Sequence, residues 1–127
     1  IPVLLNTYYP PNQPSPKRTW DLGSAIGRAV AGWESDARVA VLASGGLSHF
    51  VVLEDLDRDF LKALATKDAD AIRAMPAPVL NAGTSEIRNW IATAAAVDHL
   101  SMDLVDYVPC YRSPAGTGCA MGFAIWE

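Results

Sequence analysis

The sequence predicts an α/β fold, in which helices flank a mostly parallel sheet in three layers. Two observations support this prediction. Strand-like segments alternate with helical patterns, and residues 38–44 (RVAVLAS) form an apolar run without polar alternation. Such runs are typical of parallel strands that are covered on both faces. Strands that alternate with helices imply right-handed crossovers, which build parallel sheets.

The composition indicates one packed domain and excludes two classes of partner. The chain has 127 residues, of which 50% are hydrophobic, and a net charge of -4. Its acidic and basic residues are scattered, which gives no electrostatic footprint for nucleic acid. Glycine, serine and histidine interrupt the uncharged stretch after Arg38, so a membrane span is excluded. No basic leader precedes the first apolar segment, and a cytoplasmic location is expected.

The first residues are typical of a strand interior. Residues 1–7 (IPVLLNT) have the composition of a buried strand. We therefore expect residues 1–127 to be the C-terminal part of a single larger catalytic domain, with an N-terminal half or partner chain completing it. An oligomer is also expected.

The other elements follow from turn residues and helical periodicity. Four prolines between residues 10 and 16 predict a loop, and Thr19 is a plausible N-cap for the helix that follows. Acidic residues at 54–59 suit the start of the next helix. The predicted elements are helices over residues 19–33, 56–64, 68–75 and 84–99, and strands over residues 104–111 and 119–126, joined by a turn at residues 113–118.

His49 is the first candidate for chemistry. It follows the predicted strand at residues 38–44 through Gly45 and Gly46, which permit a turn that a Cβ would obstruct. Functional groups in α/β sheets gather at the carboxyl ends of strands. An imidazole there can transfer protons near neutral pH, although it can also simply cap a loop.

Ser48 does not fit the nucleophile elbow of hydrolases. That motif needs glycine two residues on either side of the serine, and Phe50 occupies the second position. The sequence also offers no well-placed Asp. A serine triad is therefore rejected.

Glu86 is the second candidate, at the junction between a loop and a helix. A glutamate there often serves only the helix dipole. Its alternative role is to offer one hard oxygen ligand to an iron, manganese or magnesium ion. His99 follows Glu86 by 13 residues, about 20 Å along a continuous helix. A site made of His49, His99 and Glu86 is therefore rejected.

Thr117 and the two cysteines complete the candidates. Thr117 lies between Gly116 and Gly118 and can either hydrogen-bond a substrate or serve ordinary turn chemistry. Cys110 and Cys119 have neither zinc-ligand nor disulfide-scaffold spacing. We expect both to be reduced, buried, structural thiols.

Four segments, in this order, resemble the class III extradiol ring-cleavage dioxygenases. The closest resemblance is to the catalytic subunit of protocatechuate 4,5-dioxygenase and to gallate dioxygenases, and it extends over essentially the whole chain. The segments are residues 6–11 (NTYYPP), 43–49 (ASGGLSH), 83–90 (GTSEIRNW) and 111–117 (YRSPAGT).

The resemblance implies an enzyme that holds non-haem Fe(II) through two histidines and one glutamate. Such enzymes bind a catecholic substrate and O2 and cleave the ring beside the diol. Glu86 corresponds to the carboxylate ligand and His49 to the acid/base residue. The family's two histidine ligands lie in the N-terminal half and have no counterpart here, so residues 1–127 alone are expected to be inactive.

Two other classes of function remain open. One is a non-catalytic subunit or scaffold of the same fold that pairs with an active partner. The other is a metal-dependent hydrolase of similar architecture, which oxygen consumption with a catechol would distinguish from a dioxygenase.

Overall fold

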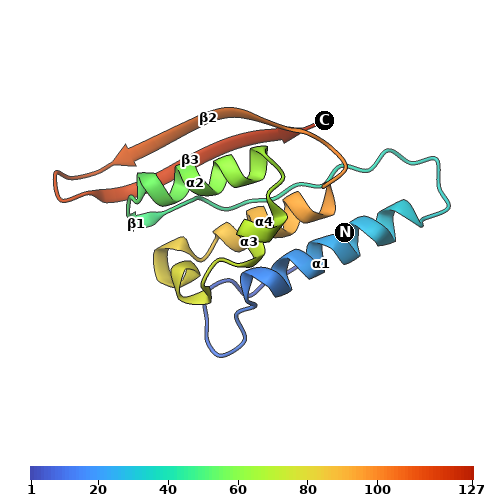
Figure 1. Ribbon diagram of the computed structural model, residues 1–127, viewed down its shortest axis with the longest axis horizontal. Coiled ribbons are helices and arrows are strands. Elements are labelled where there is room, and N and C mark those ends of the chain that lie inside the picture. The colour runs from blue at the N-terminus through green and yellow to red at the C-terminus, as the bar shows by residue number, and fades with distance from the viewer.

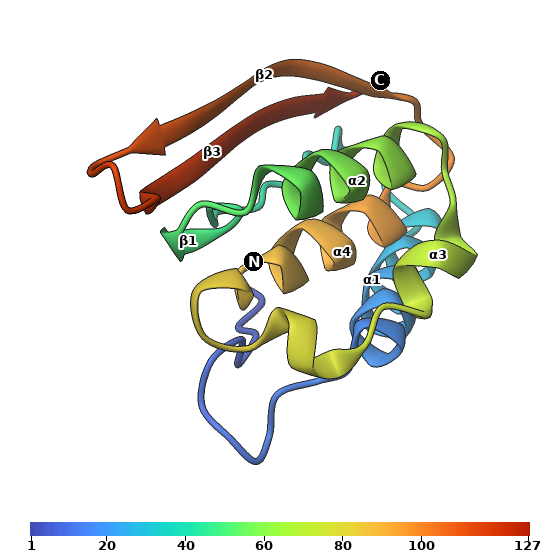
Figure 2. The same ribbon diagram turned by 60° about the vertical axis from the view of Figure 1, so that its left-hand side comes forward.

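The computed structural model describes residues 1–127 as a small sheet packed on one side against helices (Figure 1). The β2–β3 hairpin arches over α2 and α4, and α1 lies on the far side of α4 from the sheet (Figure 2). The elements are α1 (Pro16–Ala31), β1 (His49–Val51), α2 (Glu54–Ala65), α3 (Ala69–Arg73), the 3₁₀ helices η1 (Ala77–Leu80) and η2 (Ala82–Thr84), α4 (Ile87–Ala96), β2 (Met102–Tyr111) and β3 (Thr117–Trp126).

The α/β class is confirmed, but the strands pair differently from the predicted parallel arrangement. The sheet has the order β1-β3-β2, and both pairings are antiparallel. β2 and β3, the two predicted strands on either side of the turn at residues 113–118, form an antiparallel hairpin. Cys119 on the central strand pairs with His49 on β1 and with Cys110 on β2, so these three residues lie side by side across the sheet.

Residues 38–44 and 1–7 are not strands, which corrects two sequence predictions. Neither segment forms backbone ladder hydrogen bonds, and Leu42 is 92% exposed. A strand is stable only when a neighbour accepts and donates its backbone hydrogen bonds. Residues 38–44 pair with no strand in the structure and run as an irregular segment from α1 toward β1 (Figure 1).

The helices begin close to their predicted positions, with shifts that capping explains. α1 begins at Pro16, because Ser15 caps it and proline suits the first helical position. Thr19, the predicted N-cap, instead bonds through its hydroxyl to the Ser15 carbonyl at 2.9 Å. α4 is shorter than predicted at both ends, since η2 precedes it and it ends at Ala96.

The core lies between the inner face of the sheet and the helices. Leu47, Ile87, Ile91 and Ala120 have no exposed surface. α1 packs so closely on α4 that a Cβ at Gly23 would overlap the backbone of α4. No helix combines the length and apolar character required to cross a membrane.

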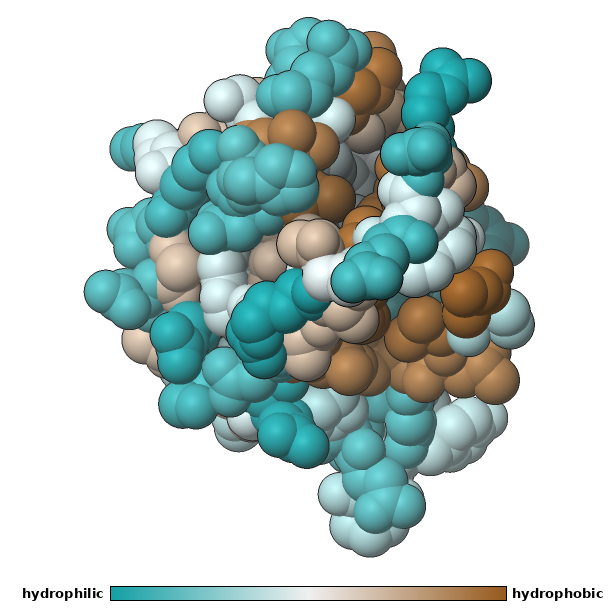
Figure 3. Space-filling model, turned by 90° about the vertical axis from the view of Figure 1, so that its right-hand side faces the viewer, coloured by the Kyte–Doolittle hydropathy of each residue, from teal (hydrophilic) through white to brown (hydrophobic).

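The outer face of the hairpin is apolar but uncovered. Strand alternation places it opposite the inner residues Ala120 and Trp126. Exposed apolar surface also appears at the end of the molecule where α1 and the hairpin terminate (Figure 3). The exposed outer residues are Val105, Val108, Met121, Phe123 and Ile125.

Candidate active site

The structure brings His49 and Glu86 together around Gly46. The Gly46 N–H donates to Oε2 of Glu86 at 2.8 Å. A Cβ built on Gly46 would lie 3.7 Å from Nδ1 of His49. Gly46, in the turn before β1, therefore lies close to both the carboxylate and the imidazole.

Glu86 is held where η2 meets α4. It occupies the N-cap position of α4 and is half-buried. Asn89 and Trp90, one turn further along, hold the same glycine turn: the Asn89 amide donates to the Ser44 carbonyl at 2.7 Å, and the Trp90 indole donates to the Gly45 carbonyl at 3.0 Å. These two contacts were not predicted from the sequence, although their spacing from Glu86 places all three side chains near one end of a helix.

His49 is fixed through both its ring and its backbone. Its Nδ1 lies 3.0 Å from the carbonyl oxygen of Leu47. Because a carbonyl only accepts, this hydrogen bond requires a proton on Nδ1, and in the neutral ring that leaves the lone pair on Nε2. Gly83 in η2 packs against the His49 carbonyl so closely that a Cβ there would overlap it.

Ser48 lies in the core rather than at a nucleophile elbow. It has no exposed surface, and its hydroxyl donates to Oδ2 of Asp57 at 2.6 Å. The sequence had indicated no well-placed Asp, which is wrong, because the first turn of α2 brings Asp57 against Ser48. The histidine beside it bonds elsewhere, so the rejection of a serine triad holds.

The two cysteines are free but exposed, which corrects the prediction that they are buried. Since Ala120 faces the helices, the alternation of β3 turns Cys119 toward the opposite face. Partial burial of the sulfur raises the pKa of the Cys119 thiol, and the neighbouring Cys110 and the charge of Glu86 raise it further. Cys119 therefore remains a neutral thiol beside the turn.

Thr117 and His99 lie apart from this pair. The hydroxyl of Thr117 is 2.7 Å from that of Ser113, inside the hairpin turn. Its role as a substrate contact stays a prediction. His99 is exposed beyond the C-terminal end of α4, so the length of that helix separates it from Glu86.

An open groove of about 1520 Å³ borders the site. Glu86, Gly45, Gly46 and Trp90 line one part of it, while His49 is not among the lining residues. Residues 39–44, the end of α1, the edge of β3 and the end of α4 with the segment that follows it, His99 included, line the rest. Most of these walls are apolar, so Glu86 is a carboxylate at the margin of an apolar groove.

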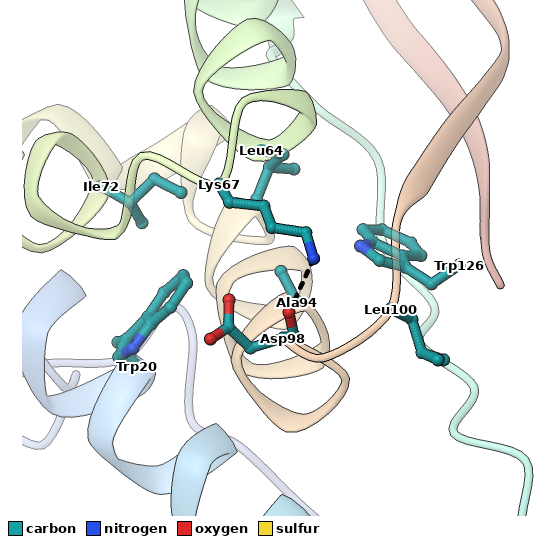
Figure 4. Close-up of a pocket in the computed structure, with 8 residues that line it drawn as sticks. All are labelled: Trp20, Leu64, Lys67, Ile72, Ala94, Asp98, Leu100 and Trp126. Carbon is teal, nitrogen blue, oxygen red and sulfur yellow. Dashed lines mark hydrogen bonds between the residues drawn. The ribbon is translucent and has the colours of Figure 1, made fainter.

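A second pocket does not compete with this site. It lies where Lys67 reaches over Leu64 and Trp126 and donates to the Asp98 carbonyl at 3.1 Å (Figure 4). Its volume is about 10 Å³, which is room for no more than one water molecule.

Residues 1–127 contain no complete metal site. No group of three His, Cys, Asp or Glu side chains is arranged to hold a metal ion. Oε2 of Glu86 accepts the Gly46 N–H, while no hydrogen bond engages Oε1. The carboxylate therefore fits the role of a single hard ligand to iron.

An α/β chain with a histidine and a carboxylate around a glycine turn is consistent with an aromatic-ring dioxygenase. Residues 1–116 match the family described as the catalytic LigB subunit of aromatic ring-opening dioxygenase. The chain belongs to this family, whose members are generally non-haem iron enzymes. This confirms the family resemblance found in the sequence. No curated protein matches the chain.

Proposed function

We propose that residues 1–127 contribute the acid/base residue and the carboxylate ligand of an Fe(II)-dependent extradiol dioxygenase. Its substrate would be a catecholic aromatic acid, such as protocatechuate or gallate. The observation that carries the proposal is the placement of both His49 and Glu86 next to Gly46. Family membership supplies the class of reaction.

Glu86 would hold the iron through its carboxylate. Bound Fe(II) would supply open coordination positions at which a diol and dioxygen meet. The Gly46 N–H keeps the orientation of Glu86 fixed by occupying Oε2 at 2.8 Å. The end of α4 and the glycine turn therefore form one rigid support for the ligand.

His49 would move the protons of the reaction. Its Nε2 accepts a proton from a diol hydroxyl, because Nδ1 is already engaged with the Leu47 carbonyl. The same nitrogen can later return this proton to an oxygen of the opened product. His49 need not bind the metal for either transfer.

The remaining ligands would come from polypeptide that covers the open groove. Two histidines are needed to complete the ligand set that the family resemblance implies. The groove is mostly apolar, and uncovered apolar surface of this extent marks an interaction site. A covering N-terminal half or partner chain would bring its ligands to Glu86 at the margin. A cytoplasmic location, an oligomeric assembly and substrate binding by Thr117 belong to the same proposal.

Iron content and oxygen uptake of the full-length enzyme with protocatechuate or gallate test the proposal. Glu86→Ala should lose iron, whereas the exposed control Glu34→Ala should keep it. His49→Asn should retain iron but lose turnover by about 10²- to 10⁴-fold, the usual contribution of a general acid/base.

The outcomes separate this proposal from its alternatives. An iron-free His49→Asn protein or an active Glu86→Ala protein would contradict the assigned roles. Iron-loaded protein that consumes no oxygen with any catechol would favour a non-catalytic subunit. Hydrolysis of substrate without oxygen consumption would identify a hydrolase.

A further inference from the structure

We propose that Asp57 is a positioning residue for His49. It holds the peptide group between Leu47 and Ser48, and the carbonyl of that group orients the imidazole. The inference rests on the proposed function only in assigning proton transfer to His49. Asp57 lies on α2 and touches neither the groove nor Glu86.

Asp57 gathers three donors at a fully buried carboxylate. Oδ1 accepts the Ser48 N–H at 3.0 Å. Oδ2 accepts the hydroxyls of Ser48 at 2.6 Å and of Tyr107 at 2.9 Å. Ser48 is held in turn from the other side, because the Leu53 N–H donates to its hydroxyl at 2.7 Å.

One rigid unit connects Asp57 to the imidazole. The Leu47 carbonyl and the Ser48 N–H belong to the same planar peptide group, so they rotate together. Asp57 holds the N–H end, and Nδ1 of His49 donates to the carbonyl end at 3.0 Å. A rotation of this plane would break both bonds at once.

The charge of Asp57 strengthens the same connection. A carboxylate that accepts the N–H polarises the peptide group and makes its carbonyl a better acceptor. This favours the proton on Nδ1 and leaves the lone pair on Nε2. The imidazole is thereby kept in the form that a general base requires.

Helix capping alone does not account for Asp57. Glu54 and Asp55 also lie in the first turn of α2, where they supply negative charge without being buried. Asp57 is buried and forms no salt bridge, and burying an unpaired charge is expensive. Two of the three donors to Asp57 come from Ser48, in the turn before His49, and the third comes from Tyr107 on β2. We infer that Asp57 supports this turn.

The test is ¹⁵N NMR of the imidazole rings of His49 and His99 in residues 1–127, at a pH where both rings are neutral. The chain contains only His49 and His99, so His99 serves as an internal reference. In the wild type we expect His49 in the Nδ1–H form. Asp57→Asn should shift its signals toward the Nε2–H form and speed exchange of the Ser48 amide by about tenfold, as loss of one hydrogen bond predicts.

Two matched variants control for the substitution itself. Asp59→Asn makes the same change at an exposed position of α2 and should leave both histidines unchanged. Tyr107→Phe removes one donor but keeps both bonds from Ser48 to Asp57, so the His49 tautomer should persist. A His49 shift of equal size in either control would overturn the positioning role.

A second variant decides the question if Asp57→Asn does not fold. Ser48→Ala removes the hydroxyl link and should also shift the His49 tautomer, by a smaller amount, since the backbone bond to Asp57 remains. A folded Asp57→Asn or Ser48→Ala protein with wild-type His49 signals would refute the inference. Rescue by Asp57→Glu is not expected, because the extra methylene cannot fit this buried site without displacing the turn.

Turnover adds an independent reading in the full-length enzyme. Asp57→Asn should lower kcat with little change in KM and should leave iron content intact. The NMR result needs neither iron nor substrate, so it stands if the proposed dioxygenase activity fails. Loss of activity with an unchanged tautomer would overturn the positioning role while leaving the dioxygenase proposal intact.

Discussion

The two faces of the β2–β3 hairpin are both apolar, but only one is covered. On the inner face Ala120 is fully buried against α2 and α4, beside core residues such as Leu61 and Ile91. On the outer face Phe123 and Ile125 are about half exposed, at 50% and 51%. Ser48 and Asp57, which support the turn that carries His49, are buried on the covered side, whereas Glu86 borders the open groove. The chain therefore determines the geometry of His49 internally, while the surroundings of Glu86 depend on what covers the groove.

The largest expected effect comes from breaking the covered side at Gly83. In Gly83→Ala, the new Cβ would overlap the His49 carbonyl, and backbone on both sides would have to move. We expect a loss of about 4 kcal/mol or more in the free energy of unfolding, or a failure to fold. Denaturant unfolding measures this. Gly32→Ala is the control, because its Cβ would meet only an ordinary contact at 3.4 Å; equal losses would contradict the close approach of η2 to β1.

A smaller loss is expected at Arg88, which ties the N-terminal loop to α4. This buried guanidinium donates to the carbonyls of Pro14 at 2.8 Å and Thr7 at 2.9 Å, and also to that of Leu80. Burial lowers the pKa of its guanidinium. Arg88→Met leaves three carbonyls without their donor, so unfolding should become about 3 kcal/mol easier.

Two comparisons sharpen the Arg88 prediction. Arg28→Met, at an exposed position of α1, should change the free energy of unfolding by less than about 0.5 kcal/mol. Arg88→Lys should recover only part of the loss, because a single ammonium cannot reproduce the fork of the guanidinium. Full stability of Arg88→Met would show that the N-terminal loop is held by other contacts.

Tyr107→Phe should have a moderate effect that depends on pH. Burial and the hydrogen bond to Asp57 raise the pKa of Tyr107 above its ordinary value of 10.0. The stabilisation by the neutral phenol is therefore complete below pH 10 and is lost as the pH rises further. Below that range Tyr107→Phe should lose about 1 kcal/mol, the usual net value of one hydrogen bond.

Unfolding curves at several pH values measure this difference. The gap between wild type and Tyr107→Phe should narrow above pH 10, where the wild type loses stability that the variant never had. A gap that stays constant or widens with pH would contradict the bond from Tyr107 to Asp57.

The helices, the last two strands and the turn between them could be predicted because their signals are local. The apolar spacing around Leu61, the proline and glycine turns and the last two strands all depend on neighbours in sequence. Whether residues 38–44 form a strand could not be predicted in this way. A strand needs a neighbouring strand to pair with, and these residues have none in the structure. The same apolar run is therefore exposed and irregular.

Within the candidate site, the types of residue were easier to predict than their support. His49 and Glu86 were identified from their positions at turns, and the structure brings both to Gly46. Asp57 was missed because an acidic run at the start of a helix is already explained by the helix dipole. Only the fold reveals that one acid of that run is buried against Ser48. Cys119 was expected to be a buried structural thiol because its spacing from Cys110 signals neither a zinc site nor a disulfide scaffold, but the alternation of β3 places it on the uncovered face.

The smallest effect is expected on the uncovered side, at Leu42. This side chain is 92% exposed, so Leu42→Ser should change the free energy of unfolding of residues 1–127 by less than about 0.5 kcal/mol. Leu61→Ser, the same change at a residue only 3% exposed, should lose about 3 kcal/mol or more. In the full-length enzyme the difference in stability loss between Leu42→Ser and Leu61→Ser should shrink, because covering polypeptide would bury Leu42. Equal behaviour of Leu42→Ser in both contexts, measured by denaturant unfolding, would show that nothing packs on this side of the groove.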